Sequence, residues 1–158
     1  MFTSKIYSKW MKKKQIQKYE DMKKFLPEIK GFILDVGCGE KWLKNFLDGK
    51  HEIKYTGIDV EYTPDALSSG DALPFKFATF DFVFCIDTIH LLKNPEEMKR
   101  VLKLGGYLII SEPKSLWRDK FLNTFKDLKI VKKCIIGNEE KDILVIFQKN
   151  KLTRPMDP

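Results

Sequence analysis

The sequence predicts an α/β fold in which a mostly parallel, twisted sheet carries helices on both faces. Three observations predict it. Apolar segments of strand length alternate with amphipathic segments, and loops rich in glycine and acidic residues follow several of the apolar segments. Near the end of the chain, two apolar segments flank Gly137-Asn138, which indicates an antiparallel hairpin. We expect the 158 residues to form one domain.

Within that domain we expect a basic N-terminal helix over residues 1–30, an α/β core over 31–149 and a short tail over 150–158. In residues 4–26, apolar side chains recur at three- and four-residue steps between lysines, which predicts the helix. Residues 1–30 hold nine lysines against three acidic residues, so six of the seven net positive charges lie there.

This basic helix has three interpretations. It is a partial lid over a ligand, with Tyr7, Trp10 or Tyr19 closing the site, or it contacts an anionic partner such as RNA. The third interpretation is a helix that packs by its apolar stripe and leaves its lysines in solvent.

The remaining elements follow from periodicity and from turn residues. Strands are predicted at residues 32–36, 53–58, 80–86, 107–111, 129–136 and 142–149, and helices at 40–47, 94–104 and 115–129. Asn94-Pro95 opens one of these helices and Gly105-Gly106 ends it. Residues 60–75 have turn chemistry and no clear period.

Four acidic residues lie in the strand-end loops of this layout. They are Asp35, Asp59, Asp71 and Asp87, and two glycines follow the first of them in the stretch "DVGCG". Since parallel strands end at one edge of a sheet, and ligands of such sheets bind there, the four carboxylates are expected to line one crevice.

The crevice chemistry favours one ligand class over another. Asp59, twenty residues past Gly39, suits the two hydroxyls of a ribose, so dinucleotides and S-adenosylmethionine compete. A dinucleotide fingerprint would place glycine at Trp42, and the negative charges of Asp35 and Glu40 would oppose a pyrophosphate. S-adenosylmethionine carries an ammonium and a sulfonium, for which these acids are suitable neighbours, so the electrostatics favour it.

Five segments in order, "LDVGCGE", "GIDV", "GDALPF", "FDFVFCIDTIHLL" and "RVLKLGGYLIISEP", resemble the landmarks of class I S-adenosylmethionine-dependent methyltransferases. The similarity is to the small, Rossmann-like methyltransferase-11 type, and it covers roughly residues 31–113. It implies a seven-stranded sheet whose last strand is antiparallel.

The resemblance also implies roles for individual residues. It assigns the methionine end of the cofactor to the glycine loop, the ribose to "GIDV", the adenine to "GDA", and the wall toward the methyl acceptor to the end of the third predicted strand. The implied cofactor-binding residues are Asp35, Val36, Gly37, Cys38, Gly39, Asp59, Val60, Asp71, Ala72 and Asp87.

His90 is a separate candidate, drawn from its position near the expected acceptor side. It is either a general base or a histidine that packs the segment "TIHLL". No metal site is expected, because Cys38, Cys85 and Cys134 lack metal-type spacing and fit reduced thiols in the cytoplasm.

The sequence departs from the family pattern in four places. Lys41 stands where the family's loop has its third glycine. If this residue has ordinary helical backbone angles, lysine lowers stability little, whereas only glycine tolerates the other backbone angles. The eleven residues between Asp59 and Asp71 are too few for a helix and a strand, so we expect a trimmed sheet edge. The helix after Pro95 is about one turn short, and Leu104 replaces a proline.

The sequence therefore predicts a minimal S-adenosylmethionine-dependent methyltransferase. It would act by in-line displacement on an oxygen, nitrogen or carbon nucleophile. The acceptor has no signature; a small molecule is favoured over RNA or protein. Two alternatives stay open: a catalytically silent cofactor- or partner-binding module, and a nucleic-acid-binding protein that uses the basic helix.

The sequence predicts a cytoplasmic location for two reasons. The apolar runs are too short to span a membrane, and no leader for secretion opens the chain. The oligomeric state has no signature.

Overall fold

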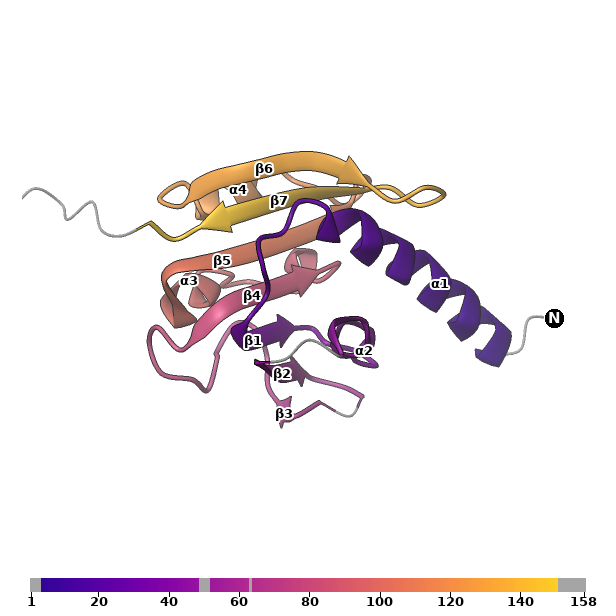
Figure 1. Cartoon of the computed structure of the whole chain (residues 1–158), viewed down its shortest axis with the longest axis horizontal. Helices are drawn as coiled ribbons and strands as arrows, with labels where there is room; N and C mark the ends of the chain where they lie inside the picture. Colours follow the sequence, from indigo (N-terminus) through magenta and orange to yellow (C-terminus); the bar gives the residue numbers. More distant parts are fainter. Residues whose placement is uncertain (1–3, 49–51, 63, 151–158) are drawn as a thin grey trace, which may run out of the picture.

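The computed structural model describes residues 4–48, 52–62 and 64–150, with side chains from residue 9 onward. Its described part contains one seven-stranded sheet in the order β3-β2-β1-β4-β5-β7-β6 (Figure 1). The strands are β1 (Gly31–Val36), β2 (Ile53–Asp59), β3 (Ala66–Leu67), β4 (Phe80–Ile86), β5 (Leu102–Pro113), β6 (Lys129–Ile136) and β7 (Asp142–Gln148).

Five of these strands are parallel, and the last two form the predicted hairpin. Strands β3, β2, β1, β4 and β5 pair in parallel, whereas β7 runs antiparallel to both β5 and β6. Strand order reverses between β1 and β4, which is the switch point of the sheet. Asp35 pairs in register with Gly57 on one side and with Phe84 on the other, so it lies at that point.

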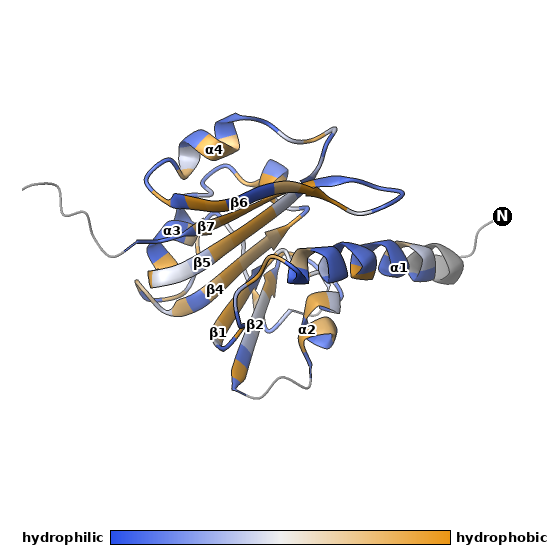
Figure 2. Cartoon of the chain, turned by 45° about the horizontal axis from the view of Figure 1, so that its top comes forward, coloured by the Kyte–Doolittle hydropathy of each residue, from blue (hydrophilic) through white to orange (hydrophobic). Residues whose placement is uncertain are grey.

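Helices cover both faces of the sheet, as predicted. The helical elements are α1 (Ser4–Lys23), α2 (Trp42–Leu47), the 3₁₀ helix η1 (Ile89–Leu91), α3 (Glu97–Val101) and α4 (Lys120–Thr124). Side chains alternate along each buried strand, so Ile33 packs under α1 and α2 while Leu34 packs under α3 and α4. Figure 2 shows the central strands as mostly apolar and the coloured part of α1 as mostly polar.

Helix α1 crosses the edge at which the parallel strands end (Figure 1). Its buried residues include Tyr19 and Met22, which join the core cluster on the α2 side of the sheet. The backbone N–H of Gly137, in the β6–β7 turn, donates to Oδ2 of Asp21 over 2.9 Å. The helix is therefore attached to the hairpin as well as to the sheet.

Three elements differ from the sequence prediction. Helices α3 and α4 have five residues each, so segment 94–104 is only partly helical and segment 115–129 consists mostly of turns and irregular chain. Strand β5 already begins at Leu102, and Gly105 and Gly106 lie inside it rather than before it. The reason is pairing across the sheet: Gly105 N–H donates to the Lys149 carbonyl, and Lys149 N–H donates to that of Gly106.

The sheet edge is trimmed, as predicted, but the edge strand survives. β3 contains only two residues, and residues 60–62 and 64–65 before it adopt no helix. Among the described residues, no helix is both long and apolar enough to cross a bilayer.

Candidate active site

A cavity of about 450 Å³ opens where β1, β2 and β4 end. Helix α1 forms a further part of its wall. The lining residues are Met11, Gln15, Tyr19, Asp35, Gly37, Cys38, Gly39, Glu40, Trp42, Asp59, Tyr62, Ile86, Asp87 and Thr88. The structure thus brings together the glycine loop and the acids that end β1, β2 and β4.

The glycine loop needs both of its glycines for backbone reasons. Gly37 has a φ of +75°, and a Cβ there would collide with the side chain of Thr88. Gly39 has a φ of +52°, and apart from its chain neighbours no described residue has an atom within 4 Å of where its Cβ would be. The first glycine therefore allows close packing, and the second leaves open space beside the loop.

Asp59 ties the end of β2 to this loop. Its Oδ2 accepts the backbone N–H of Gly39 at 2.9 Å, and its Oδ1 accepts that of Glu61 at 3.0 Å. Each carboxylate oxygen has a further lone pair, so Asp59 can still accept two hydroxyl donors.

Asp35 is almost completely buried, with 3% of its surface exposed. The hydroxyl of Tyr55 donates to its Oδ2 at 2.5 Å. Burial raises the pKa of Asp35 to about 7, with a further contribution from the negative charge of Asp59 and against the lowering effect of the Tyr55 hydrogen bond. A cation beside Asp35 would favour its ionised form.

Lys41 adopts the backbone conformation that glycine would provide. Its φ is 60° and its ψ 37°, which is the left-handed region and not ordinary helical geometry. The condition under which lysine would cost little is therefore not met. The Lys41 ammonium lies 2.7 Å from Oδ1 of Asp65, an ion pair that joins the loop to the β2–β3 connection.

Asp71 and Ala72 do not line the cavity. Oδ1 of Asp71 accepts the backbone N–H groups of Lys93 and Asn94, at 2.8 and 2.6 Å, so it orders the turn before α3. Val60 is 64% exposed and is also outside the lining. The adenine role of Asp71 and Ala72 and the ribose role of Val60 stay predictions.

His90 also lies outside the cavity lining. Its Nδ1 is 2.9 Å from Oε2 of Glu112, a fully buried carboxylate at the end of β5. Burial raises the pKa of Glu112 despite the opposing effect of His90. The catalytic role of His90 stays a prediction, and the contact with Glu112 orients its ring.

Asp87 ends β4 with a φ of 54°, an uncommon value for a residue other than glycine. Its Oδ2 lies 3.4 Å from the ammonium of Lys18, which reaches down from α1. Lys18 also pairs with Glu140 and Asp142. No sequence pattern indicated this cluster, because Lys18 is one of nine lysines in residues 1–30.

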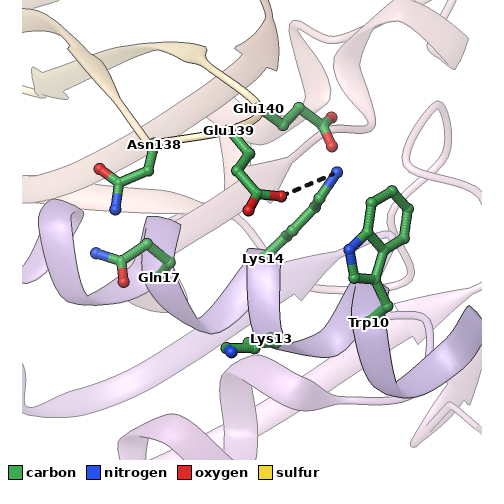
Figure 3. A pocket seen from close by; sticks show the side chains of 7 residues that line it. All are labelled: Trp10, Lys13, Lys14, Gln17, Asn138, Glu139 and Glu140. Atoms are coloured by element: carbon green, nitrogen blue, oxygen red, sulfur yellow. Dashed lines mark ion pairs between the residues drawn. The ribbon is translucent and has the colours of Figure 1, made fainter. Parts of the chain in front are cut away.

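The aromatic residues proposed for the lid occupy different places. Tyr19 lines the cavity, together with Met11 and Gln15 from the same helix. Trp10 lines a second cavity of about 320 Å³ between α1 and the β6–β7 turn (Figure 3). There the Lys14 ammonium lies 3.4 Å from the Trp10 ring centroid and 3.8 Å from Glu139. The side chain of Tyr7 lies outside the described residues.

The second cavity contains none of the predicted cofactor residues. Its other lining residues are Lys13, Gln17, Asn138 and Glu140. The chemistry predicted from the strand ends therefore belongs to the larger cavity.

Comparison with known proteins agrees with this geometry. Residues 34–110 match the family described as "Methyltransferase domain". An uncharacterized protein of Methanocaldococcus jannaschii is 32% identical over 139 residues, which cover 78% of this chain and 63% of that protein. A ribosomal protein L11 methyltransferase of Campylobacter concisus is 32% identical over 115 residues, covering 62% and 40%. The chain thus spans less than two thirds of either relative.

The fold is shared with solved methyltransferase structures. A SAM-dependent methyltransferase from Aquifex aeolicus superposes with a TM-score of 0.64 at 21% identity, over 81% of this chain and 88% of that one. The ordered motifs, the matched segment and the fold agree. Residues 34–110 thus form a methyltransferase domain with a class I, Rossmann-like fold, and S-adenosylmethionine is the cofactor of this family.

Proposed function

We propose that this protein transfers a methyl group from S-adenosylmethionine to an oxygen, nitrogen or carbon nucleophile, with a small molecule favoured as the acceptor over RNA or protein. One observation carries the proposal. Asp35, the two loop glycines, Asp59 and Asp87 converge on a single cavity at the switch point of the sheet.

The residues of the cavity fit the cofactor's charges. Asp35 faces the cavity as a buried carboxyl that a neighbouring ammonium would ionise, and Asp59 has acceptor capacity left for the ribose hydroxyls. Trp42 lines the wall where a pyrophosphate-binding loop would have glycine, and no lysine, arginine or histidine belongs to the described lining. The bound cofactor would supply a sulfonium, whose methyl carbon is electrophilic.

The protein's own contribution is to position the reactants and exclude water. Met11, Gln15 and Tyr19 place α1 over the cavity as a partial lid. The in-line approach of an acceptor would come from the side of Asp87 and Thr88. We also propose a cytoplasmic location, because the described helices include none that could cross a membrane.

Calorimetry with S-adenosylhomocysteine tests the cofactor site. We expect the wild type to bind, and Asp59→Ala to lose about ten- to a hundredfold in affinity, because hydrogen bonds to a charged group contribute about 1.5–3 kcal/mol. Asp59→Asn keeps an acceptor for Gly39 and separates the loop contact from the carboxylate charge. Asp48→Ala, at an exposed residue outside the cavity lining, is the matched control. A wild type that does not bind would refute the cofactor assignment.

Methyl transfer needs its own experiment. Tritiated S-adenosylmethionine is incubated with the protein and with metabolite, RNA and protein fractions of a cell extract. We expect label in the metabolite fraction. Cofactor binding without transfer to any fraction would favour the silent module instead. Salt-dependent RNA binding that is lost without residues 1–24 would favour the nucleic-acid-binding alternative, which the comparisons do not favour.

A further inference from the structure

Three carboxyl groups and one ammonium meet beneath α1, beside the proposed cofactor cavity. The Lys18 ammonium lies 2.8 Å from Oδ1 of Asp142, 3.3 Å from Oε1 of Glu140 and 3.4 Å from Oδ2 of Asp87. The side chain of Lys18 is 2% exposed and that of Asp142 is completely buried. Asp87 is the member of this group that lines the cavity.

The cluster has too few donors for its carboxyl oxygens. Oδ1 of Asp87 and Oδ2 of Asp142 are buried and accept no hydrogen bond from any described residue. Two ionised carboxylates in this position would be costly, because a single lysine faces both of them and Glu140. A proton shared between Asp87 and Asp142 removes one negative charge and supplies the missing donor.

We propose that Asp87 and Asp142 share one proton, and that this pair receives the proton that the methyl acceptor loses during transfer. The proposal rests on the proposed function and adds a catalytic role for Asp87, which touches the cavity, and a positioning role for Asp142. Because Oδ1 of Asp87 is buried, Oδ2 is the oxygen that meets the acceptor. The left-handed backbone of Asp87 is consistent with a residue held in place for function.

The step balances in atoms and charge. The acceptor's O–H or N–H bond breaks, and its nucleophilic atom forms the new bond to the methyl carbon as the electron pair of the carbon–sulfur bond returns to sulfur. The released proton binds Oδ2 of Asp87, and the proton already on Asp87 moves to Asp142. The pair ends with two protons and no net charge.

This chemistry narrows the acceptor class. An acceptor that arrives as a neutral hydroxyl or amine has a proton to give to the pair. One whose reacting end is a phosphate or a carboxylate would face Asp35, Asp59 and Asp87 without a basic residue among the described lining. We therefore infer an acceptor with an O–H or N–H group on an uncharged or cationic end.

The groups around Asp87 support a retained proton. They are Lys18 and Tyr19 from α1, Asp35 from β1, Cys85 from β4, Glu112 with His90 from the other side, Glu140 from the β6–β7 turn and Asp142 from β7. Burial raises the pKa of Asp87 to about 9, together with the neighbouring carboxyl group of Asp142 and repulsion from Glu112, against the lowering effect of Lys18.

Proton counting by calorimetry tests the pair without a known acceptor. S-adenosylmethionine and S-adenosylhomocysteine differ by the methyl group and the sulfonium charge. Titration of each at pH 8 in two buffers of different ionisation enthalpy gives the protons released on binding. We expect the wild type to release about half a proton more with S-adenosylmethionine, because a cation beside Asp87 lowers its pKa by one or more units.

Three variants show which residues are responsible for the extra proton release. In Asp142→Asn and in Asp87→Asn the extra proton release with S-adenosylmethionine should disappear. Any difference that remains in both variants comes from the ligands themselves. In Glu140→Gln, which leaves the pair intact, the excess should remain. Circular dichroism first establishes that each variant is folded. Because Asp87 and Asp142 are each replaced in turn, the test still works if one of the two variants does not fold.

Each outcome decides something. If both ligands bind and the difference in proton release between them is the same in the wild type as in the variants, the inference is overturned and the proposed function stands. Failure of both ligands to bind would overturn the proposed function, and the inference with it. An excess lost in Asp142→Asn and Asp87→Asn but kept in Glu140→Gln would support the pair.

Discussion

The ammonium of Lys41 lies 2.7 Å from Oδ1 of Asp65, and Oδ2 of the same carboxylate accepts the backbone N–H of Gly57 in β2 at 2.8 Å. One carboxylate thus holds both the start of α2 and the central part of β2. Lys41 meets this partner in a left-handed conformation, so the ion pair and the strained backbone occur in the same residue.

The relative stability of Lys41→Gly and Lys41→Ala distinguishes a left-handed from an ordinary helical backbone at this residue. In a helix interior, alanine is more stable than glycine by about 1 kcal/mol. In a left-handed conformation the order reverses, because Cβ clashes cost about 1–2 kcal/mol. We therefore expect Lys41→Gly to unfold at higher urea than Lys41→Ala. Both variants lose the ion pair with Asp65, so this loss does not affect the difference between them. A more stable Lys41→Ala would contradict the left-handed geometry.

The two loop glycines should respond differently to alanine. Both have positive φ, so both Gly37→Ala and Gly39→Ala pay about 1–2 kcal/mol in strain. Only the Cβ at Gly37 meets another side chain, that of Thr88, and overpacking adds about 1–3 kcal/mol. We expect Gly37→Ala to lose more unfolding free energy in urea denaturation. Equal losses would show that the β1 and β4 loops can separate freely.

Sequence patterns predicted the sheet well because most of its strands are apolar runs of strand length, and β1, β4 and β7 are largely buried. Residues 80–86 and 129–136 were predicted with the bounds that β4 and β6 have. The helical period of residues 115–129 was misleading. Phe121, Phe125 and Leu128 are buried, but only Phe121 lies in α4, and the turn after this helix brings the other two side chains to the core.

In the candidate site, too, some residues could be predicted from the sequence and others could not. Asp35, Gly37, Gly39, Asp59 and Asp87 meet at the cavity, because residues at the carboxyl ends of neighbouring strands need no long-range information to be placed together. Lys18 and Asp142 depend on how α1 crosses the sheet. No local pattern distinguishes a buried lysine from the solvated lysines beside it.

The stability of the unligated protein should depend on pH through Asp35. Its pKa is about 7 in the folded protein, against an ordinary value of 3.8 that applies in the unfolded chain, so the folded state binds more protons between these values. Stability from this group is complete below about pH 4 and is lost as the pH rises toward 7, with a slope of up to about 1.4 kcal/mol per pH unit. Asp35→Asn should remove this component of the slope in urea titrations at several pH values.

Binding of the cofactor should show the opposite dependence on pH. An ammonium favours the ionised form of Asp35, so below pH 7 binding must release its proton, and the affinity for S-adenosylhomocysteine should rise by up to tenfold per pH unit until about pH 7. In Asp35→Asn the affinity should be lower and nearly constant over this range. Tyr55→Phe removes the hydrogen bond that lowers the pKa of Asp35, so its plateau should begin at a higher pH. A wild-type affinity that is constant from pH 5 to 7 would show that Asp35 does not meet the ammonium, whatever its role in stability.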